Sequence, residues 1–251
     1  MNSKPLWKPT KFAERNGRLR ASVSEQRSRV SSRLVTELVA REYGRAIPLY
    51  VRGDLVDMGC GKAPLWGTYS GYATSTFLVD WANSLHENPL LDCVCDLNAP
   101  LPFEDQRFDT IVLSDVLEHI QDPMPLWHEM MRVLRPGGHV LLNVPFLYWI
   151  HEYPWDFYRY TEFALQRFAR EAKFEVRELT AIGGFLEVLT DLTSKRLGRI
   201  PVAGRPFAVI TQELVFRWNE RRSRSGRSAT PNHTEMFPLG YFMVVRKPTA
   251  E

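Results

Sequence analysis

Three aspartates lie within or at the ends of short apolar runs, where parallel strands present side chains to a ligand. With their neighbours they are Asp57 with Gly59, Cys60 and Gly61, then Asp80 with Trp81, then Asp96 with Leu97. Glycines let a chain turn tightly and approach a ligand, and the following helix presents free N–H groups. A carboxylate about 20 residues further on can accept both ribose hydroxyls. Asp96, together with the backbone N–H of Leu97, suits the polar edge of an adenine ring. A G-x-G pair alone would also fit an ordinary glycine turn.

A second set of titratable side chains follows the apolar run 108–115. It comprises Asp115, Glu118 and His119. His119 is a candidate general base because the pKa of a free imidazole, about 6.5, suits proton transfer near neutrality. In the alternative reading, Glu118 and His119 stabilise a helix start or pack beneath the ligand.

The segment 151–161, HEYPWDFYRYT, is unusually rich in functional groups. One reading makes it a lid over an acceptor, with His151 or Asp156 as the base. Its candidate substrate contacts are Tyr153, Asp156, Tyr158 and Arg159. The other reading is a structural loop, in which the aromatic rings fill the core and Asp156 pairs with Arg159.

The elements that position these residues alternate between strands and helices. Strands are predicted at 55–59, 75–80, 93–97, 108–115 and 137–146, with a helix after Pro123 that Pro136-Gly137-Gly138 ends. Short apolar runs separated by helices indicate βαβ units and a parallel sheet. A helix within 160–174, with Thr161 as N-cap, and strands at 174–182 and 239–246 complete the pattern.

The predicted organisation is one α/β domain with additions. Residues 1–47 are expected to form a helical extension and residues 48–251 the main domain. An insertion at about 183–235 would contain two amphipathic helices, 185–197 and 207–218, and a flexible basic loop, 221–232.

Composition narrows the class of protein. The 251 residues have a net charge of +3, three cysteines without zinc-ligand spacing, no signal-like start and no long apolar span. A cytoplasmic protein fits these features. The charge is uneven: residues 1–47 and 195–227 each carry +7, whereas residues 48–194 carry −11.

Residues 54–146 resemble class I S-adenosylmethionine-dependent methyltransferases, particularly the type 11 group. The resembling stretches are LVDMGCG, FLVDW, CDLNAPLPFEDQRFDTIVLSDVLEHI and LRPGGHVLLNVPF. The resemblance implies a Rossmann-like seven-stranded sheet of order 3-2-1-4-5-7-6, with only the last strand antiparallel and helices on both faces. It implies S-adenosylmethionine as cofactor, with Asp57, Gly59 and Gly61 near the methionine part and Ser114 near the sulfonium. One departure is Ala63-Pro64, where a third glycine is common.

The expected activity is methyl transfer to oxygen, or less readily nitrogen, of a small-molecule, glycan or lipid-linked acceptor. The segment 151–161 is similar to a stretch in methyltransferases encoded beside bacterial glycan-assembly genes, which suggests such acceptors. The alternatives are a nucleic-acid methyltransferase and a non-catalytic cofactor-binding regulator. The N-P-P-[YF] signature of adenine methylation is missing after 108–115. Asp115, Glu118 and His119 resemble the Mg²⁺ ligands of some quinone-pathway members, but no metal site is predicted.

The basic flanks allow several partners. They could be solvated surfaces, or they could bind nucleic acid or an anionic membrane. The apolar residues of 185–218 would then lie at the membrane surface. The same helices could instead form a dimer face or a lid.

Overall fold

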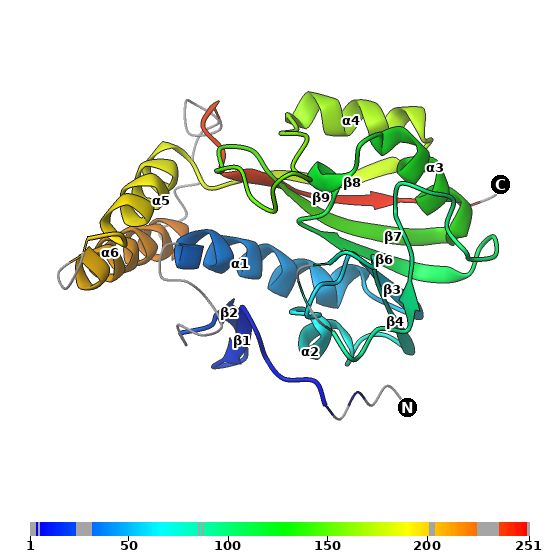
Figure 1. The fold of residues 1–251 in the computed structure, drawn as a ribbon, viewed down its shortest axis with the longest axis horizontal. Helices are drawn as coiled ribbons and strands as arrows, with labels where there is room; N and C mark the ends of the chain where they lie inside the picture. The colour runs from blue at the N-terminus through cyan, green and yellow to red at the C-terminus, as the bar shows by residue number, and fades with distance from the viewer. Residues whose placement is uncertain are drawn as a thin grey trace.

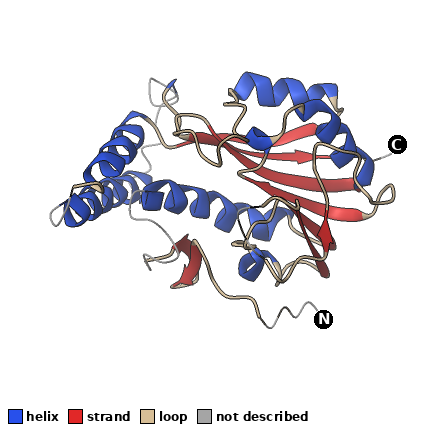
Figure 2. Cartoon of the chain, viewed as in Figure 1, coloured by secondary structure: helices blue, strands red, loops and turns tan. Residues whose placement is uncertain are grey.

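The computed structural model describes residues 4, 6–23, 32–84, 86, 88–200, 204–224 and 236–249. Its centre is a seven-stranded sheet of order β5-β4-β3-β6-β7-β9-β8. The strands are β3 (Asp54–Met58), β4 (Ser75–Asp80), β5 (Cys93–Val94), β6 (Phe108–Ser114), β7 (Leu134–Pro145), β8 (Glu175–Ile182) and β9 (Gly240–Arg246) (Figures 1 and 2). Only β9 runs antiparallel to its neighbours. The predicted strand order and the single reversed strand are confirmed.

The sheet is apolar on both faces because helices cover both. Successive residues of β3, Leu55 and Val56, enter the two different core clusters. Helix α1 (Arg33–Tyr50) packs on the Leu55 side, and α3 (Pro123–Val133) and α4 (Glu162–Glu171) pack on the other (Figure 1). This two-sided burial explains why the strand sequences are nearly continuous apolar runs.

Two side chains cap the N-termini of helices. Asp122 accepts a hydrogen bond from the backbone N–H of Met124 at the start of α3, with Pro123 in the first turn. Thr161 accepts from Ala164 at the start of α4, as its sequence position predicts.

The N-terminal extension is not wholly helical, which corrects the prediction for residues 1–47. Strands β1 (Phe12–Arg15) and β2 (Arg18–Ala21) form an antiparallel hairpin. Asn16 and Gly17 at its turn have φ of 53° and 68°. An Asn-Gly pair with two positive φ angles is the favoured two-residue hairpin connection, so the signal was present in the sequence. Helix α1 passes through residue 47 and ends at Tyr50.

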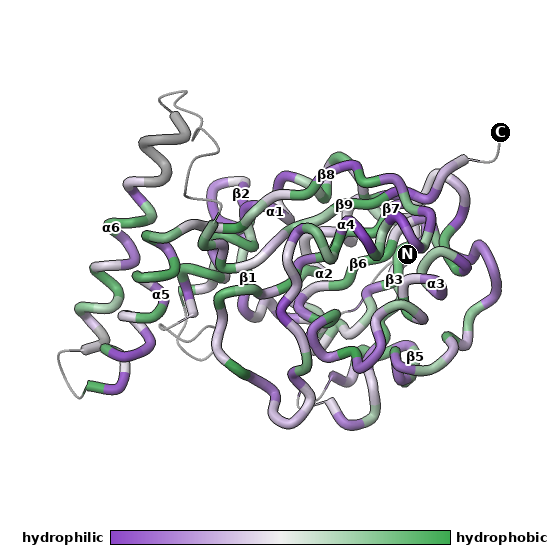
Figure 3. The backbone as a smooth tube through the Cα atoms, turned by 90° about the horizontal axis from the view of Figure 1, so that it is seen from above, coloured by the Kyte–Doolittle hydropathy of each residue, from purple (hydrophilic) through white to green (hydrophobic). Residues whose placement is uncertain are grey.

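The insertion between β8 and β9 contains two helices, α5 (Phe185–Leu197) and α6 (Gly204–Arg224). They lie together at one end of the molecule, beyond the N-terminal end of α1, and Figure 3 shows apolar stretches along both. Residues 221–224 belong to α6 rather than to a loop, and the rest of the predicted basic loop lies outside the described residues. Within the described part of the chain, no helix is long and apolar enough to cross a membrane.

Candidate functional site

A cavity of about 1120 Å³ opens at the carboxyl ends of β3, β4, β5 and β6. In a parallel sheet this edge is where ligands bind. Most of the predicted cofactor residues line the cavity: Gly59, Cys60, Gly61, Asp80, Trp81, Asp96, Leu97 and Ser114.

The loop after β3 requires glycine at two positions. Gly59 and Gly61 have φ of 68° and 51°. A Cβ on Gly59 would lie 2.6 Å from a methyl group of Val116, and a Cβ on Gly61 would lie 3.2 Å from the His86 ring. Both steric space and backbone conformation therefore select glycine, and the loop backbone faces the cavity.

Asp80 is fixed at the cavity wall by two backbone N–H groups. Gly61 donates to its Oδ2 at 3.2 Å, and Trp81 donates to its Oδ1 at 2.9 Å. The residue is only 6% exposed. Each carboxylate oxygen keeps a second lone pair, so the group can still accept hydroxyl hydrogens from a ligand. Ser114, at the end of β6, donates to Oδ1 of Asn143 at 2.8 Å.

Asp57 is placed differently from the other predicted cofactor residues. Its side chain is buried, accepts a 2.7 Å hydrogen bond from the Tyr69 hydroxyl, and does not line the cavity. Burial raises the pKa of Asp57 to about 7, and the nearby Asp80 carboxylate adds to this effect. Asp57 is therefore part of the buried interior rather than of the cavity lining.

The N-terminal segment contributes residues that the sequence analysis did not find. Thr10 and Lys11 line the cavity, and Lys11 Nζ lies 2.9 Å from Oδ2 of Asp115. Burial alone would lower the pKa of Lys11, but the attraction of Asp115 outweighs it and leaves the pKa raised. Trp7 donates from its indole to the carbonyl of Ala63 at 2.9 Å. These contacts hold the segment across the glycine loop.

The segment 151–161 is fastened beside the cavity by hydrogen bonds to residues 117–121. Phe157 N–H donates to the carbonyl of Glu118, the Tyr158 hydroxyl to that of Gln121, and the Tyr160 hydroxyl to that of Leu117. Glu152 and Trp155 line the cavity, and Trp155 packs edge-on against Trp81, with ring centroids 5.4 Å apart.

The four predicted substrate residues are not part of the lining of this cavity. Tyr153 is 85% exposed, and Asp156 and Arg159 form an ion pair in which the Asp156 side chain is buried. None of Tyr153, Asp156, Tyr158 and Arg159 is among the described residues that line the cavity. Their contact with substrate stays a prediction. Within the segment 151–161, the spacing of residues in the sequence does not distinguish those that line the cavity from those that stabilise the segment.

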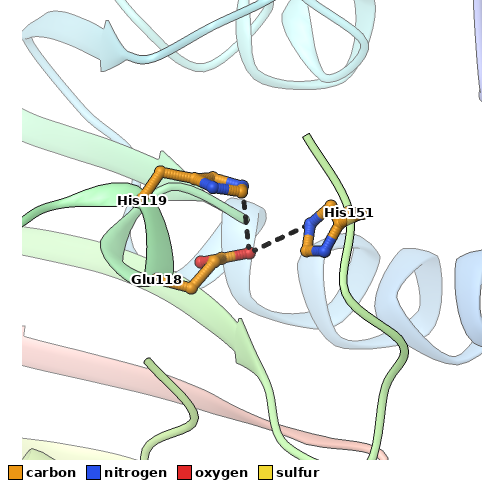
Figure 4. A group of neighbouring side chains, drawn as sticks. All are labelled: Glu118, His119 and His151. Carbon is orange, nitrogen blue, oxygen red and sulfur yellow. Dashed lines mark ion pairs between the residues drawn. The ribbon is translucent and has the colours of Figure 1, made fainter. Parts of the chain in front are cut away.

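The two candidate bases lie together over a buried carboxylate. His119 lines the cavity, His151 does not, and their ring centroids are 4.9 Å apart. Both face Glu118, which is fully buried (Figure 4). Burial, followed by repulsion from Asp115, raises the pKa of Glu118. Burial and the neighbouring His119 lower the pKa of His151.

The strand order, the single reversed strand and the glycine loop at the cavity define a class I methyltransferase fold. Residues 56–142 match the family model described as a methyltransferase domain, Methyltransf_11. This match covers part of the chain and confirms, over these residues, the predicted resemblance to type 11 methyltransferases.

Relatives by sequence match parts of the chain. An uncharacterized 37.1 kDa transposon protein of Streptomyces fradiae is 32% identical over 101 residues, which are 36% of this chain and 29% of that protein. An uncharacterized methyltransferase of Mycobacterium sp. (strain KMS) is 49% identical over 43 residues, 17% of each chain. One of Schizosaccharomyces pombe is 31% identical over 104 residues, 34% of this chain and 37% of that one. The matches thus span less than two fifths of these relatives.

Solved structures share the fold at low sequence identity. A protein of Galdieria sulphuraria, described as a sarcosine dimethylglycine methyltransferase, matches with a TM-score of 0.54, 15% identity, and coverage of 96% of this chain and 94% of that chain. The cyclase SpnF matches with a TM-score of 0.53, 16% identity, and coverage of 96% and 87%. A Bacillus halodurans protein described as a methyltransferase matches with a TM-score of 0.52 and 16% identity. The match covers 87% of this chain and 100% of that chain.

Proposed function

We propose that this protein is an S-adenosylmethionine-dependent methyltransferase that acts on an oxygen, or less readily a nitrogen, of a small-molecule, glycan or lipid-linked acceptor. The observation that carries the proposal is the Asp80 carboxylate, buried and fixed beside two obligatory glycines at the cavity. These residues fit the cofactor, because the carboxylate can accept both ribose hydroxyls and the glycine backbone leaves room for the methionine part.

The bound cofactor would supply an electrophilic methyl group on a sulfonium. The residues of this chain would hold it: Asp80 at the ribose, Asp96 and Leu97 at the adenine, and Ser114 near the sulfonium, all at one cavity. The task of this chain would be to hold the acceptor oxygen in line with the carbon–sulfur bond of that cofactor, so that the methyl group could pass to oxygen while the bonding electron pair remained on sulfur. Holding the two reactants in line supplies much of the acceleration.

A hydroxyl or ammonium acceptor must also lose a proton. Of the two histidines predicted as bases, His119 is the one that lines the cavity. Its Nδ1 donates to the carbonyl of Trp155, so its Nε2 lone pair is free. His151 contacts His119 from behind and would act through it. An acceptor that is already anionic needs no base.

Calorimetry with S-adenosylhomocysteine tests cofactor binding. We expect the wild type to bind one molecule per chain, and Asp80→Ala to bind at least about tenfold more weakly, because the ribose loses a charge-assisted hydrogen-bond partner. Asp80→Asn, which can still accept from Gly61, separates this loss from collapse of the loop. The exposed Asp105→Ala is the matched control. Unchanged binding in both Asp80 variants would refute the cofactor assignment.

A non-catalytic use of the same fold is the second candidate. The structural similarity to SpnF, which is described as a cyclase, shows that this fold is not restricted to methyltransferases. Turnover of S-adenosylmethionine over a panel of sugar, lipid-linked and small-molecule acceptors distinguishes the two functions. Cofactor binding without any turnover would favour the second.

The proposed setting is the cytoplasm, with peripheral contact to anionic membranes through α5 and α6. The large apolar side chains exposed on these helices include Phe185, Leu189, Leu192, Phe207, Ile210, Leu214 and Trp218. On α6 they recur at helical spacing and form one stripe, and Arg196 and Arg217 lie nearby in the sequence. Apolar side chains beside cations are typical of an interfacial anchor. A homodimer through the same stripe is the alternative.

A further inference from the structure

We propose that Glu118, His119 and His151 bind a divalent transition-metal ion, such as zinc, beside the cofactor cavity. The Oε1 atom of Glu118 lies 3.8 Å from Nε2 of His119 and 3.7 Å from Nε2 of His151 (Figure 4). One ligand atom from each of the three residues lies within 4.8 Å of the others. Two imidazoles and one carboxylate form a ligand set that zinc takes in sites with an open coordination position.

The histidine rings are oriented as metal ligands are. The Nδ1 atom of His119 lies 2.6 Å from the carbonyl oxygen of Trp155, which can only accept, so this nitrogen carries the hydrogen. The Nδ1 atom of His151 lies 3.2 Å from Oδ2 of Asp156, at ion-pair distance but without hydrogen-bond geometry. Asp156 accepts a hydrogen bond from the His151 backbone N–H and is itself held by Arg159. In both rings Nε2 is left to face Glu118. Metal-binding histidines commonly place their other nitrogen against a carbonyl or carboxylate in this way.

Glu118 lacks the partners that a buried carboxylate needs. The residue is 0% exposed, and neither of its carboxylate oxygens has a hydrogen-bond partner among the described residues. The histidine nitrogens, at 3.7 and 3.8 Å, are too distant to donate hydrogen bonds. Tetrahedral zinc with bonds of about 2.1 Å would bring neighbouring ligand atoms to roughly 3.4 Å of each other. The two distances from Glu118 to the histidines exceed this by about 0.3 and 0.4 Å, and all three ligand atoms already lie within 4.8 Å of one another.

The proposed metal site gives the segment 151–161 a function that does not depend on contact with a substrate. Its residues His151 and Asp156 provide a ligand and its support, and Trp155 orients His119. The Phe157 N–H donates to the carbonyl of Glu118 and fixes the two parts of the site together. Because His119 lines the cavity, an acceptor oxygen could take the open coordination position. This use of the metal rests on the proposed methyltransferase function, whereas metal binding does not.

Zinc titration of the tag-free, chelator-treated full chain tests the proposal. We expect one Zn²⁺ per chain by calorimetry, at least about 100-fold weaker binding in His119→Ala and His151→Ala, and unchanged binding in His128→Ala, an exposed histidine on α3. Mg²⁺ should bind far more weakly because it prefers an all-oxygen shell. Zn²⁺ should raise the melting temperature of the wild type but not that of the isosteric Glu118→Gln.

The supporting residue gives a second measurement. Asp156→Asn should weaken zinc binding by about 10- to 100-fold and shift the visible absorption of the Co²⁺-substituted protein. A wild type that takes up no Zn²⁺, or a His151→Ala variant that binds it normally, would overturn the site and leave His119 as a base. S-adenosylhomocysteine binding, measured on the same samples, separates the proposals: retained cofactor binding without zinc binding refutes only the metal site.

Discussion

At the scale of single residues, two aspartates have different roles because they occupy different positions along their strands. Asp57 and Asp80 both follow apolar runs, and both were predicted to contact the cofactor. Asp80 lies at the cavity wall, whereas Asp57 is buried against Tyr69. Residue type and spacing predict that a carboxylate is present, but the direction of its side chain depends on the neighbouring strand and loop.

The buried Asp57 predicts a pH dependence of stability. Its pKa, about 7, is above the ordinary 3.8, so between those values the folded state binds more protons than the unfolded chain. Its contribution to stability therefore falls as pH rises from about 4 to 7, by at most about 4 kcal/mol. Asp57→Asn should remove this loss. Urea unfolding at pH 5 and pH 8 measures it, with Asp105→Asn as control. Equal pH dependence in wild type and Asp57→Asn would contradict the prediction.

Gly59 predicts a steric effect on both stability and binding. Gly59→Ala places a methyl group against Val116 at a positive φ, so we expect a loss of about 1–3 kcal/mol of stability and weaker S-adenosylhomocysteine binding. Gly71→Ala is the matched control, because a Cβ there meets nothing within 4 Å. Thermal unfolding and calorimetry give the two readouts. Similar behaviour of the two variants would be incompatible with a glycine-dependent loop.

At the scale of elements, the strands were predictable and the segments that cross the site were not. The apolar runs indicate the alternation, and the resemblance supplied the strand order. The predicted helix stop at Pro136-Gly137-Gly138 is wrong, because α3 ends at Val133 and these three residues lie within β7. The Asn16-Gly17 hairpin has a local signal that the helical prediction overlooked. The contact between Lys11 and Asp115 joins residues 104 positions apart and has no local signal. Packing, rather than spacing, brings such residues to a site.

The N-terminal segment should contribute to cofactor binding. Lys11 is at the cavity, where its charge can attract the carboxylate of the methionine part, and it neutralises Asp115. We expect Lys11→Gln to weaken S-adenosylhomocysteine binding by about tenfold, in line with the loss of one partly buried charge interaction. The exposed Lys8→Gln should bind normally. Equal affinities in wild type and Lys11→Gln would show that the segment only covers the loop.

At the scale of the whole molecule, the uneven charge has a partial structural explanation. The acidic centre supplies the cavity residues Asp80, Asp96 and Asp115, whereas one basic flank includes the end of α5 and all of α6. Helix α5 also contacts the region of the candidate site. Its Lys195 lies 3.8 Å from the ring centre of Tyr148 and pairs with Asp191.

The membrane proposal predicts salt-sensitive binding to anionic vesicles. Wild type should pellet with vesicles containing anionic lipid at low salt, and Ile210→Ser combined with Leu214→Ser should reduce binding by about tenfold or more, because apolar area is lost from the stripe. Phe163→Ser, on the exposed face of α4, is the control. No pelleting of wild type at low salt would exclude the membrane, and a change of mass in the double variant would indicate a dimer.

The reversal of β9 has a consequence for how this protein could diversify. Because β8 runs parallel to the other strands and β9 runs against them, the connection between them leaves and re-enters the sheet at the edge that holds the cavity. Insertions here can lengthen or change without altering the pairing of any strand. Whatever α5 and α6 bind is therefore brought to the same edge of the sheet as the cavity. Under the proposed function, a surface that sets location and a surface that selects the acceptor could then evolve in one segment.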